Sequence, residues 1–324
     1  MSNGNKSSTD GGSSLVAFPT GSAPSMSIAR SLPYTVDNIS SMTPMELLTA
    51  QLKSSSSGDA RVDAMRRIVT VAEAMGLEST VNQLIPYLAN SIGLVEGEED
   101  DEILFTLGQQ LGKLVPGLVP GSKALPMLSI LERLASVEET VVREQAVESI
   151  NKIVPEIYQS DDSNSNTPAL LLAMAKRLTG ADWFTAKVSA AGILPSIYSY
   201  FNLRNNQGDD ESKRELRALY KDLAEDEAPM VRRSAARHLG AFVEAVAGLP
   251  NPVFNHEINT TNAKSIVLDD FVPIFHTLSR DEQDSVRLLA VVAAGSIASA
   301  LNDASTNADV VLPIVRNGCV DLSW

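Results

Sequence analysis

Cysteine and aromatic residues are scarce in this chain. Of its 324 residues one is a cysteine, Cys319, and 5% are aromatic. A single thiol excludes an intramolecular disulfide and a cysteine-rich metal site. This usage is typical of the reducing cytosol and nucleus, so we expect a cytoplasmic protein and leave a nuclear location open. The apolar residues are mostly Ala, Val, Leu and Ile, which suits stacked helices better than a sheet-rich core.

Basic residues are outnumbered by acidic ones. The chain holds 26 Lys and Arg against 40 Asp and Glu, a net charge of −14. The phosphates of a nucleic acid would be repelled by such a surface, so we expect no nucleic acid partner. Two interpretations of the acidic surface stay open: it binds basic patches on partner proteins, or it keeps the chain in solution.

The sequence also lacks the patterns of a membrane protein, a secreted protein or an enzyme. No run approaches about 18 uninterrupted apolar residues, and no charged N-terminal region precedes an apolar one. The histidines His238, His256 and His276 have no metal-ligand spacing. No nucleophile elbow or glycine-rich dinucleotide motif occurs. We therefore expect no enzyme, no metal, no cofactor and no membrane partner.

Two regions of different character divide the chain. Residues 1–42 are rich in Ser and Gly and lack periodicity, which predicts a disordered tail. In residues 43–324 the apolar positions recur every three or four residues, and no convincing strand pattern with a period of two occurs. This second region is therefore predicted to be all-α. One stretch that shows the helical spacing is Val142, Ala146, Ile150 and Ile153.

A short pattern recurs in the helical region: an acidic cluster, then a basic residue, then Ala three residues later. Its basic positions are spaced by 44, 45 and 55 residues, and two pairs of prolines in the preceding helices by 40. Units of about 40 residues with two helices are typical of the HEAT and armadillo class. The instances are residues 138–143 with Ala146, 182–187 with Ala190, 226–232 with Ala235, and 281–287 with Ala290.

We accordingly expect an all-α HEAT-repeat superhelix, a solenoid of about seven repeats with the last incomplete. The variable inserts fall between repeats, and turns within repeats stay short apart from residues 95–101. The edge formed by the turns within repeats is the expected binding edge, although uniform turn length is also a packing requirement. The predicted repeats span residues 43–76, 81–117, 123–158, 168–202, 213–247, 269–301 and 309–324.

Each part of the pattern has an expected physical role. The acid should cap the following helix, whose first N–H groups are unpaired and whose dipole is positive there. The basic residue can reach the acid of a neighbouring turn, which would form a ladder of ion pairs along one edge. Proline in the first helix of a repeat should bend that helix and let the pair stack.

The clusters are more specific than a generic HEAT repeat. From about Thr43 to Trp324 the chain resembles the scaffold (A, or 65 kDa regulatory) subunit of protein phosphatase 2A, in its N-terminal HEAT repeats. The resemblance implies a non-catalytic horseshoe whose early turns hold an exchangeable regulatory B subunit, while its last repeats hold the catalytic subunit. The runs that carry it are residues 138–149, 182–185, 229–233 and 281–291, with 107–112 and 321–324.

Carried over by position, the resemblance implies a set of partner-binding residues. Trp183 stands out, because a Trp in a polar turn is exposed at a cost and is a common interface anchor. For Arg232 and Arg233 a structural role between repeats is as plausible as contact with a partner. The set comprises Glu138, Glu139, Asp182, Trp183, Phe184, Glu227, Pro229, Arg232, Arg233, Asp284 and Trp324.

The resemblance covers part of the family's length. The chain stops at Trp324, where the second helix of the seventh repeat should begin. We therefore expect a fragment that keeps the half for the regulatory subunit. The catalytic subunit would be a partner only if the C-terminal repeats were present. The alternative is a HEAT-repeat adaptor for transport or complex assembly that is unrelated to the phosphatase.

Overall fold

A computed structural model describes residues 41–54, 58–91, 100–160, 165–204, 206–250 and 262–323. Within these ranges the chain forms helices joined by turns and contains no strand. Almost all of the predicted tail, residues 1–42, lies outside the described residues, as do Trp324 and the middle of the insert at 249–264. The tail and Trp324 therefore remain predictions.

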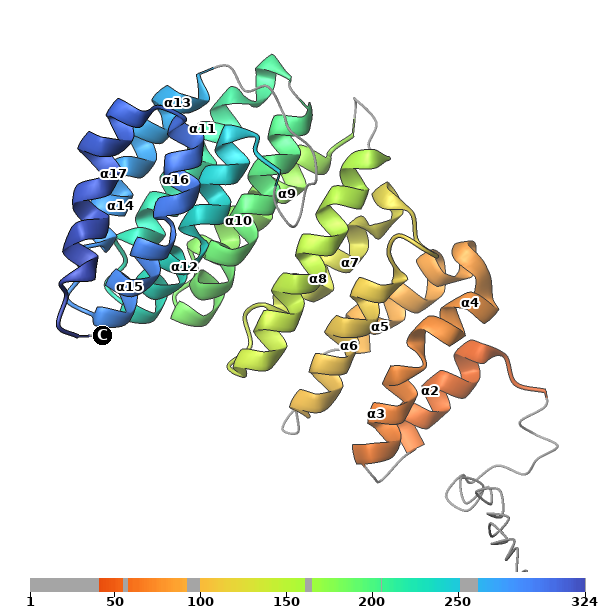
Figure 1. The fold of residues 1–324 in the computed structure, drawn as a ribbon. Helices are drawn as coiled ribbons and strands as arrows, with labels where there is room; N and C mark the ends of the chain where they lie inside the picture. Colours follow the sequence, from red (N-terminus) through yellow and green to blue (C-terminus); the bar gives the residue numbers. More distant parts are fainter. Residues whose placement is uncertain are drawn as a thin grey trace, which may run out of the picture.

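The helices follow one another in pairs, each with a first and a second helix (Figure 1). In repeat 1 the first helix is α2 (Pro44–Ser54) and the second consists of α3 (Gly58–Arg66) and α4 (Ile68–Ser79). In repeat 2 the first helix consists of a π-helical segment (Thr80–Leu84) and α5 (Ile85–Ser91), and the second is α6 (Asp101–Leu114). In repeat 3 the first helix consists of a 3-10 segment (Gly121–Ala124) and α7 (Leu125–Leu134), and the second is α8 (Thr140–Gln159). Repeat 4 is α9 (Thr167–Thr179) with α10 (Phe184–Arg204); repeat 5 is a 3-10 segment (Gln207–Asp209) and α11 (Asp210–Ala224) with α12 (Pro229–Ala247). Repeat 6 is α13 (Ala263–Ile266), a π-helical segment (Val267–Phe271) and α14 (Val272–Leu278) with α15 (Asp284–Val292) and α16 (Ala294–Leu301); α17 (Ala304–Cys319) follows it.

The pairs stack into two layers. Second helices α6, α8, α10 and α12 pack side by side, and α12 packs on α15 and α16 (Figure 1). First helices α5, α7, α9 and α11 form the other layer. Buried aliphatic side chains form one continuous core between the layers, from Leu48 to Ile314. Because each repeat contacts only its neighbours, this is the arrangement of an α-helical solenoid, and the predicted fold class is confirmed.

The few aromatic residues gather in repeats 4 to 6. The ring of Phe242 lies 4.6 Å from that of Tyr220, 5.1 Å from that of Phe271 and 5.2 Å from that of Tyr198. All three contacts are edge-to-face, the geometry that aromatic pairs prefer. The four rings come from α10, α11, α12 and the segment before α14, so they connect three successive repeats through the core.

Prolines mark changes of winding in the first helices. Pro86 and Pro273 lie just after the two π-helical segments, and Pro126 lies just after a 3-10 segment. Such changes are where helices bend; Pro313, the fourth proline of the pattern, lies inside α17 (Ala304–Cys319), and the expected bending stays a prediction. Pro155 and Pro195 lie inside the second helices α8 and α10, where the repeat pattern gave no reason to expect a proline.

One stretch, Asp284–Leu301, is long and apolar enough by composition to cross a membrane, with a mean hydropathy of 1.5. In the structure it forms α15 and α16, which meet at Ala293 and pack on α12 and α17. A third of it is buried inside the solenoid. The core helix of a globular protein meets the same two criteria, so length and composition here are weak evidence for a membrane span.

Candidate protein-binding edge and groove

The turns within repeats 3 to 6 lie along one edge of the solenoid, the lower edge in Figure 1. We call this the turn edge; it comprises residues 135–139, 180–183, 225–228 and 279–283, and residues 320–323 continue it after α17. Nine of the eleven residues in the expected partner-binding set lie on these turns or in the first turn of the helix that follows, and a tenth, Arg233, begins the second turn of α12. The structure therefore brings the set to one edge; the eleventh, Trp324, is outside the described residues.

The acids of the turn edge fold the turns in two different ways. Glu139 lies at the N-terminus of α8 and accepts a long hydrogen bond, 3.5 Å, from the Val141 N–H, as expected of a cap. Asp226, Asp281 and Asp321 likewise accept from the N–H two residues further on, at 2.9, 2.9 and 3.0 Å, but here those N–H groups belong to the turn and not to a following helix. These are turns of the Asx type, so the capping expected of Asp226 and Asp281 is wrong.

The same three acids also pair with a basic residue of the preceding unit. Lys187 Nζ lies 2.8 Å from Asp226 Oδ2, Arg232 Nε lies 2.6 Å from Asp281 Oδ2, and Arg287 Nε lies 2.7 Å from Asp321 Oδ2. The expected ladder is thus confirmed from repeat 4 to the turn after α17, and we call each ion pair a rung. Because each rung joins the turns of two successive repeats, it fixes the rotation of one repeat against the next.

Each arginine of the ladder also holds its own turn. Arg232 Nη1 donates to the carbonyl oxygens of Asp226 and Glu227, and Arg287 Nη1 donates to those of Asp281 and Glu282. Burial alone would raise the pKa of Asp281, but the hydrogen bonds from Arg232 and the Gln283 N–H outweigh it and hold that pKa below its ordinary value. Arg232 therefore has a structural role: it stabilises its own turn and connects repeat 5 to repeat 6.

The ladder is interrupted between repeats 3 and 4. Arg143 donates to the carbonyl oxygens of Val137 and Glu138 and to Thr140 Oγ1, all in its own turn. Among the described residues Arg143 makes no ion pair with Asp182, the acid at the corresponding place in the next turn. Arg143 Nε is buried without a hydrogen-bond partner, and burial lowers the pKa of this guanidinium.

Apolar side chains are exposed at the turn edge beside the acids. Trp183 is 75% exposed, Phe184 40% and Met230 51%. Val141 is also exposed. Val141 and Met230 were missed from the sequence, although a signal was present: each lies two residues before the basic residue of its repeat. Around them the exposed polar and turn residues are Glu138, Asp182, Glu227, Pro229 and Asp284.

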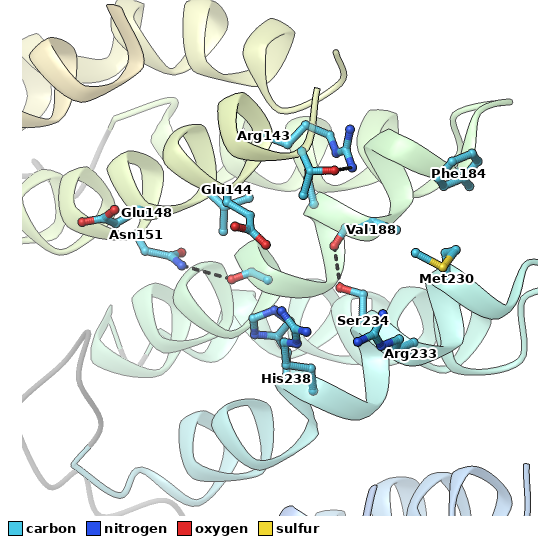
Figure 2. Close-up of a pocket in the computed structure, with 15 residues that line it drawn as sticks. Arg143, Glu144, Glu148, Asn151, Phe184, Val188, Met230, Arg233, Ser234 and His238 are labelled. Carbon is cyan, nitrogen blue, oxygen red and sulfur yellow. Dashed lines mark hydrogen bonds between the residues drawn. The ribbon is translucent and has the colours of Figure 1, made fainter. Parts of the chain in front are cut away.

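A groove of about 550 Å³ lies on the second-helix layer, across repeats 3 to 5 (Figure 2). Helices α8, α10 and α12 line it side by side, and Phe184 and Met230 stand at its turn-edge end. Arg233 faces this groove, whereas its neighbour Arg232 belongs to the ladder. The residues that we use below are Glu144, Glu148 and Asn151 from α8; Val188 and Gly192 from α10; Ser234, Arg237 and His238 from α12.

The floor of the groove is closely packed and its polar atoms are mostly paired. A Cβ atom on Gly192 would lie 3.0 Å from Val147 Cγ1 and 3.3 Å from His238 Nε2, so only glycine fits without a shift of these neighbours. Asn151 Nδ2 donates to the Gly192 carbonyl oxygen at 3.1 Å, and Ser234 Oγ donates to that of Val188 at 2.8 Å. Burial, aided by the charge of Arg237, lowers the pKa of His238 to about 4, and the ring is neutral at pH 7.

Comparison with known proteins gives regulatory A subunits of protein phosphatase 2A as relatives. The chain is 35% identical over 291 residues to the A-type regulatory subunit of protein phosphatase PP2A from Schizosaccharomyces pombe, which covers 90% of this chain and 44% of the relative. It is 39% identical over 204 residues to the alpha isoform of the 65 kDa regulatory subunit of serine/threonine-protein phosphatase 2A from Arabidopsis thaliana, covering 63% of this chain and 32% of the relative. The chain belongs to the family of protein phosphatase 2A scaffold subunits.

The match to this scaffold family extends to the human beta isoform of the 65 kDa regulatory subunit, 36% identical over 215 residues, 65% of this chain and 32% of the relative. The chain thus spans less than half the length of these curated relatives. No protein-family profile matches it. Among solved structures, a designed armadillo repeat protein is 16% identical with a TM-score of 0.40, over 81% of this chain and 100% of that one.

Proposed function

We propose that this chain is a non-catalytic scaffold segment whose turn edge binds a regulatory B subunit of protein phosphatase 2A. The observation that carries the proposal is Trp183, whose side chain is 75% exposed in a turn. Exposing a large apolar ring to water is unfavourable, and Trp is among the residues most enriched at the energetic centres of protein interfaces. The names of the relatives, which are regulatory or scaffold subunits, support the same role.

The surroundings of Trp183 suit a partner with mixed chemistry. Phe184 and Met230 add apolar surface on two successive repeats. The exposed acids Glu138, Asp182 and Glu227 place negative charge beside it. We therefore expect the partner surface to present an apolar pocket bordered by Lys or Arg, and the association rate to fall as salt rises.

The test is a binding measurement with purified regulatory subunits, taken one class at a time. Trp183→Ala should weaken binding by about tenfold or more. Leu170→Ala is the matched control, because Leu170 is an exposed apolar residue of the same repeat on the first-helix layer. Circular dichroism should show equal helicity for both variants. The proposal fails if no regulatory subunit binds, or if the two variants bind alike.

Two further arms separate this role from the alternative. The isolated catalytic subunit should not bind this segment, and a transport or assembly factor captured in place of any phosphatase subunit would favour an unrelated adaptor.

We also propose a cytoplasmic location, supported by the free, exposed Cys319. Fluorescence microscopy of the tagged chain would test it, and would also report any nuclear fraction.

A further inference from the structure

The groove across α8, α10 and α12 carries opposite charges on its two walls. Glu144 and Glu148 lie four residues apart on α8, and therefore on one face of that helix. Arg233 and Arg237 have the same spacing on α12. Helix α10 lies between the two walls and contributes no charged side chain to the groove.

The α8 wall also carries Arg143, which bonds within its own turn, and its Glu148 pairs with Lys152 at 2.6 Å. Glu144 makes no ion pair with the described residues, so the groove has an available acid on one side, an uncharged middle and two arginines on the other.

The basic wall has no anion of its own. Neither Arg233 nor Arg237 makes a hydrogen bond or ion pair with the described residues, although the chain has an excess of acids. Arg233 Nε is buried without an acceptor. A buried donor without a partner is unfavourable, so an anionic group entering the groove would gain a hydrogen bond that the solenoid itself leaves unmade.

The middle of the groove suits an uncharged segment. The Asn151 and Ser234 donors already bond to carbonyl oxygens of α10, which leaves the neutral ring of His238 as the polar group beside Gly192. Gly192 presents no side chain, and Val147 and Val188 flank it. Phe184 and Met230 provide exposed apolar surface at the turn-edge end (Figure 2).

The distance between the walls sets the length of an occupant. Neighbouring packed helices have axes about 8–10 Å apart, so α8 and α12 are roughly 16–20 Å apart across α10. An extended chain advances about 3.3 Å per residue. A segment of about five or six residues therefore reaches from one wall to the other.

We propose that this groove binds an extended segment of a partner protein. The segment carries a Lys or Arg over Glu144 and Glu148, an Asp or Glu over Arg233 and Arg237, and an apolar side chain between them. This site adjoins the turn-edge contact proposed above and shares Phe184 and Met230 with it, but Trp183 does not line the groove. It also spans the junction where the ladder is interrupted, so its occupant would connect repeat 3 to repeat 5.

The test uses fluorescent peptides of about eight residues and the full chain. The dipolar peptide has Lys near one end, Glu near the other and Leu between; control peptides have Lys at both ends, Glu at both ends, or Ser for Leu. We expect the dipolar peptide to bind at least about fivefold more tightly than each control. Arg233→Glu with Arg237→Glu, and Glu144→Lys with Glu148→Lys, should each weaken it by about tenfold.

The fourfold charge exchange, which combines both pairs of substitutions, should restore binding, because the peptide can then lie in the reverse direction. Arg280→Glu with Arg316→Glu is the matched control, since both arginines are exposed, outside the groove and undergo the same charge change. That control should bind like the unaltered chain. Trp183→Ala should bind the peptide normally, which distinguishes failure here from failure at the turn edge.

Three results would overturn the proposal: no binding of the dipolar peptide, equal binding of the dipolar and control peptides, or equal loss in the groove variant and in the matched control. If the fourfold exchange fails to fold by circular dichroism, Arg233→Gln with Arg237→Gln decides the matter. That milder variant should bind a Glu-ended and a Gln-ended peptide equally, whereas the unaltered chain prefers the Glu end; a preference that persists in the variant also overturns the proposal.

Discussion

Arg232 of repeat 5 and Asp281 of repeat 6 form a bidentate ion pair, with Nε to Oδ2 at 2.6 Å and Nη2 to Oδ1 at 3.2 Å. The two side chains are only 14% and 7% exposed. Fork-like pairing of this kind is geometrically specific as well as strong. It therefore fixes how one repeat is rotated against the next, and removing one partner leaves a largely buried charge behind.

Arg232→Gln should destabilise the chain by about 2–4 kcal/mol, because the Asp281 carboxylate would lose its partner while staying buried. The measurement is the free energy of unfolding in urea. Arg214→Gln serves as the control: Arg214 pairs with Glu211 at 2.5 Å, but both side chains are exposed, and the expected change is below about 0.5 kcal/mol. Equal effects of the two substitutions would contradict a structural role for Arg232.

The interrupted rung gives a second prediction. A double-mutant cycle on Arg232 and Asp281 should give a coupling energy of about 1 kcal/mol or more. The same cycle on Arg143 and Asp182 should give a coupling near zero, since Arg143 bonds within its own turn. Arg143→Gln alone should still destabilise, through loss of the bonds to the turn carbonyls. Significant coupling between Arg143 and Asp182 would show that the ladder is continuous in solution.

His238 predicts a pH dependence of stability. Its pKa is lowered to about 4 in the folded chain, against about 6.5 in the unfolded chain. The unfolded state therefore binds the proton more readily, and the stability present above pH 6.5 is lost as the pH falls from 6.5 to 4. The loss from this group is at most about 3 kcal/mol.

Urea unfolding at several pH values in this window would measure the effect. His238→Gln should flatten the dependence on pH, whereas His276→Gln, at an exposed position, should leave the slope of the unaltered chain. Asp281 does not confuse the comparison, because its pKa lies below its ordinary value and its contribution is lost only at lower pH. A slope unaffected by His238→Gln would contradict a partly buried ring that is neutral in the folded chain.

Two glycines should respond oppositely to alanine. A Cβ on Gly112 would lie 2.5 Å from Ser149 Oγ, where α6 and α8 approach closely, while a Cβ on Gly295 meets nothing within 4 Å. Gly112→Ala should cost about 1–3 kcal/mol. Gly295→Ala should stabilise by about 0.5–1 kcal/mol, since Gly loses more backbone freedom in a helix. Thermal unfolding of both variants would check the difference in sign.

The local spacing of residues in the sequence was enough to predict the helices, the turn edge and the ladder. An acid, a basic residue five or six positions later and a repeat of that pattern determine the contacts between turns, because neighbouring repeats stack in the same orientation. The capping expected of Asp226 and Asp281 was wrong, since a carboxylate before a helix can bond to the turn instead. In both cases the carboxylate also pairs with a basic residue of the preceding repeat, Lys187 or Arg232, which holds it in the turn.

The groove could not have been predicted in the same way. Glu148 and Arg233 face one hollow only because α8, α10 and α12 stack with a particular rotation, and no local pattern encodes that rotation. Arg232 and Arg233 illustrate the limit. Adjacent residues on a helix point about 100° apart, so one reaches the ladder and the other the groove, although from the sequence we expected the same role for both.

The missing rung between repeats 3 and 4 also has a mechanical meaning. From repeat 4 onward, each unit is tied to the next at the turn edge, and aromatic rings connect repeats 4 to 6 inside. The joint between repeats 3 and 4 has no rung and is held at the turn edge by the neutral hydrogen bond from Thr185 Oγ1 to the Ser136 carbonyl oxygen, 3.0 Å long. Under tension applied along the stack, this joint should stretch before the joints between repeats 4, 5 and 6, and single-molecule pulling would register it as an earlier step of extension.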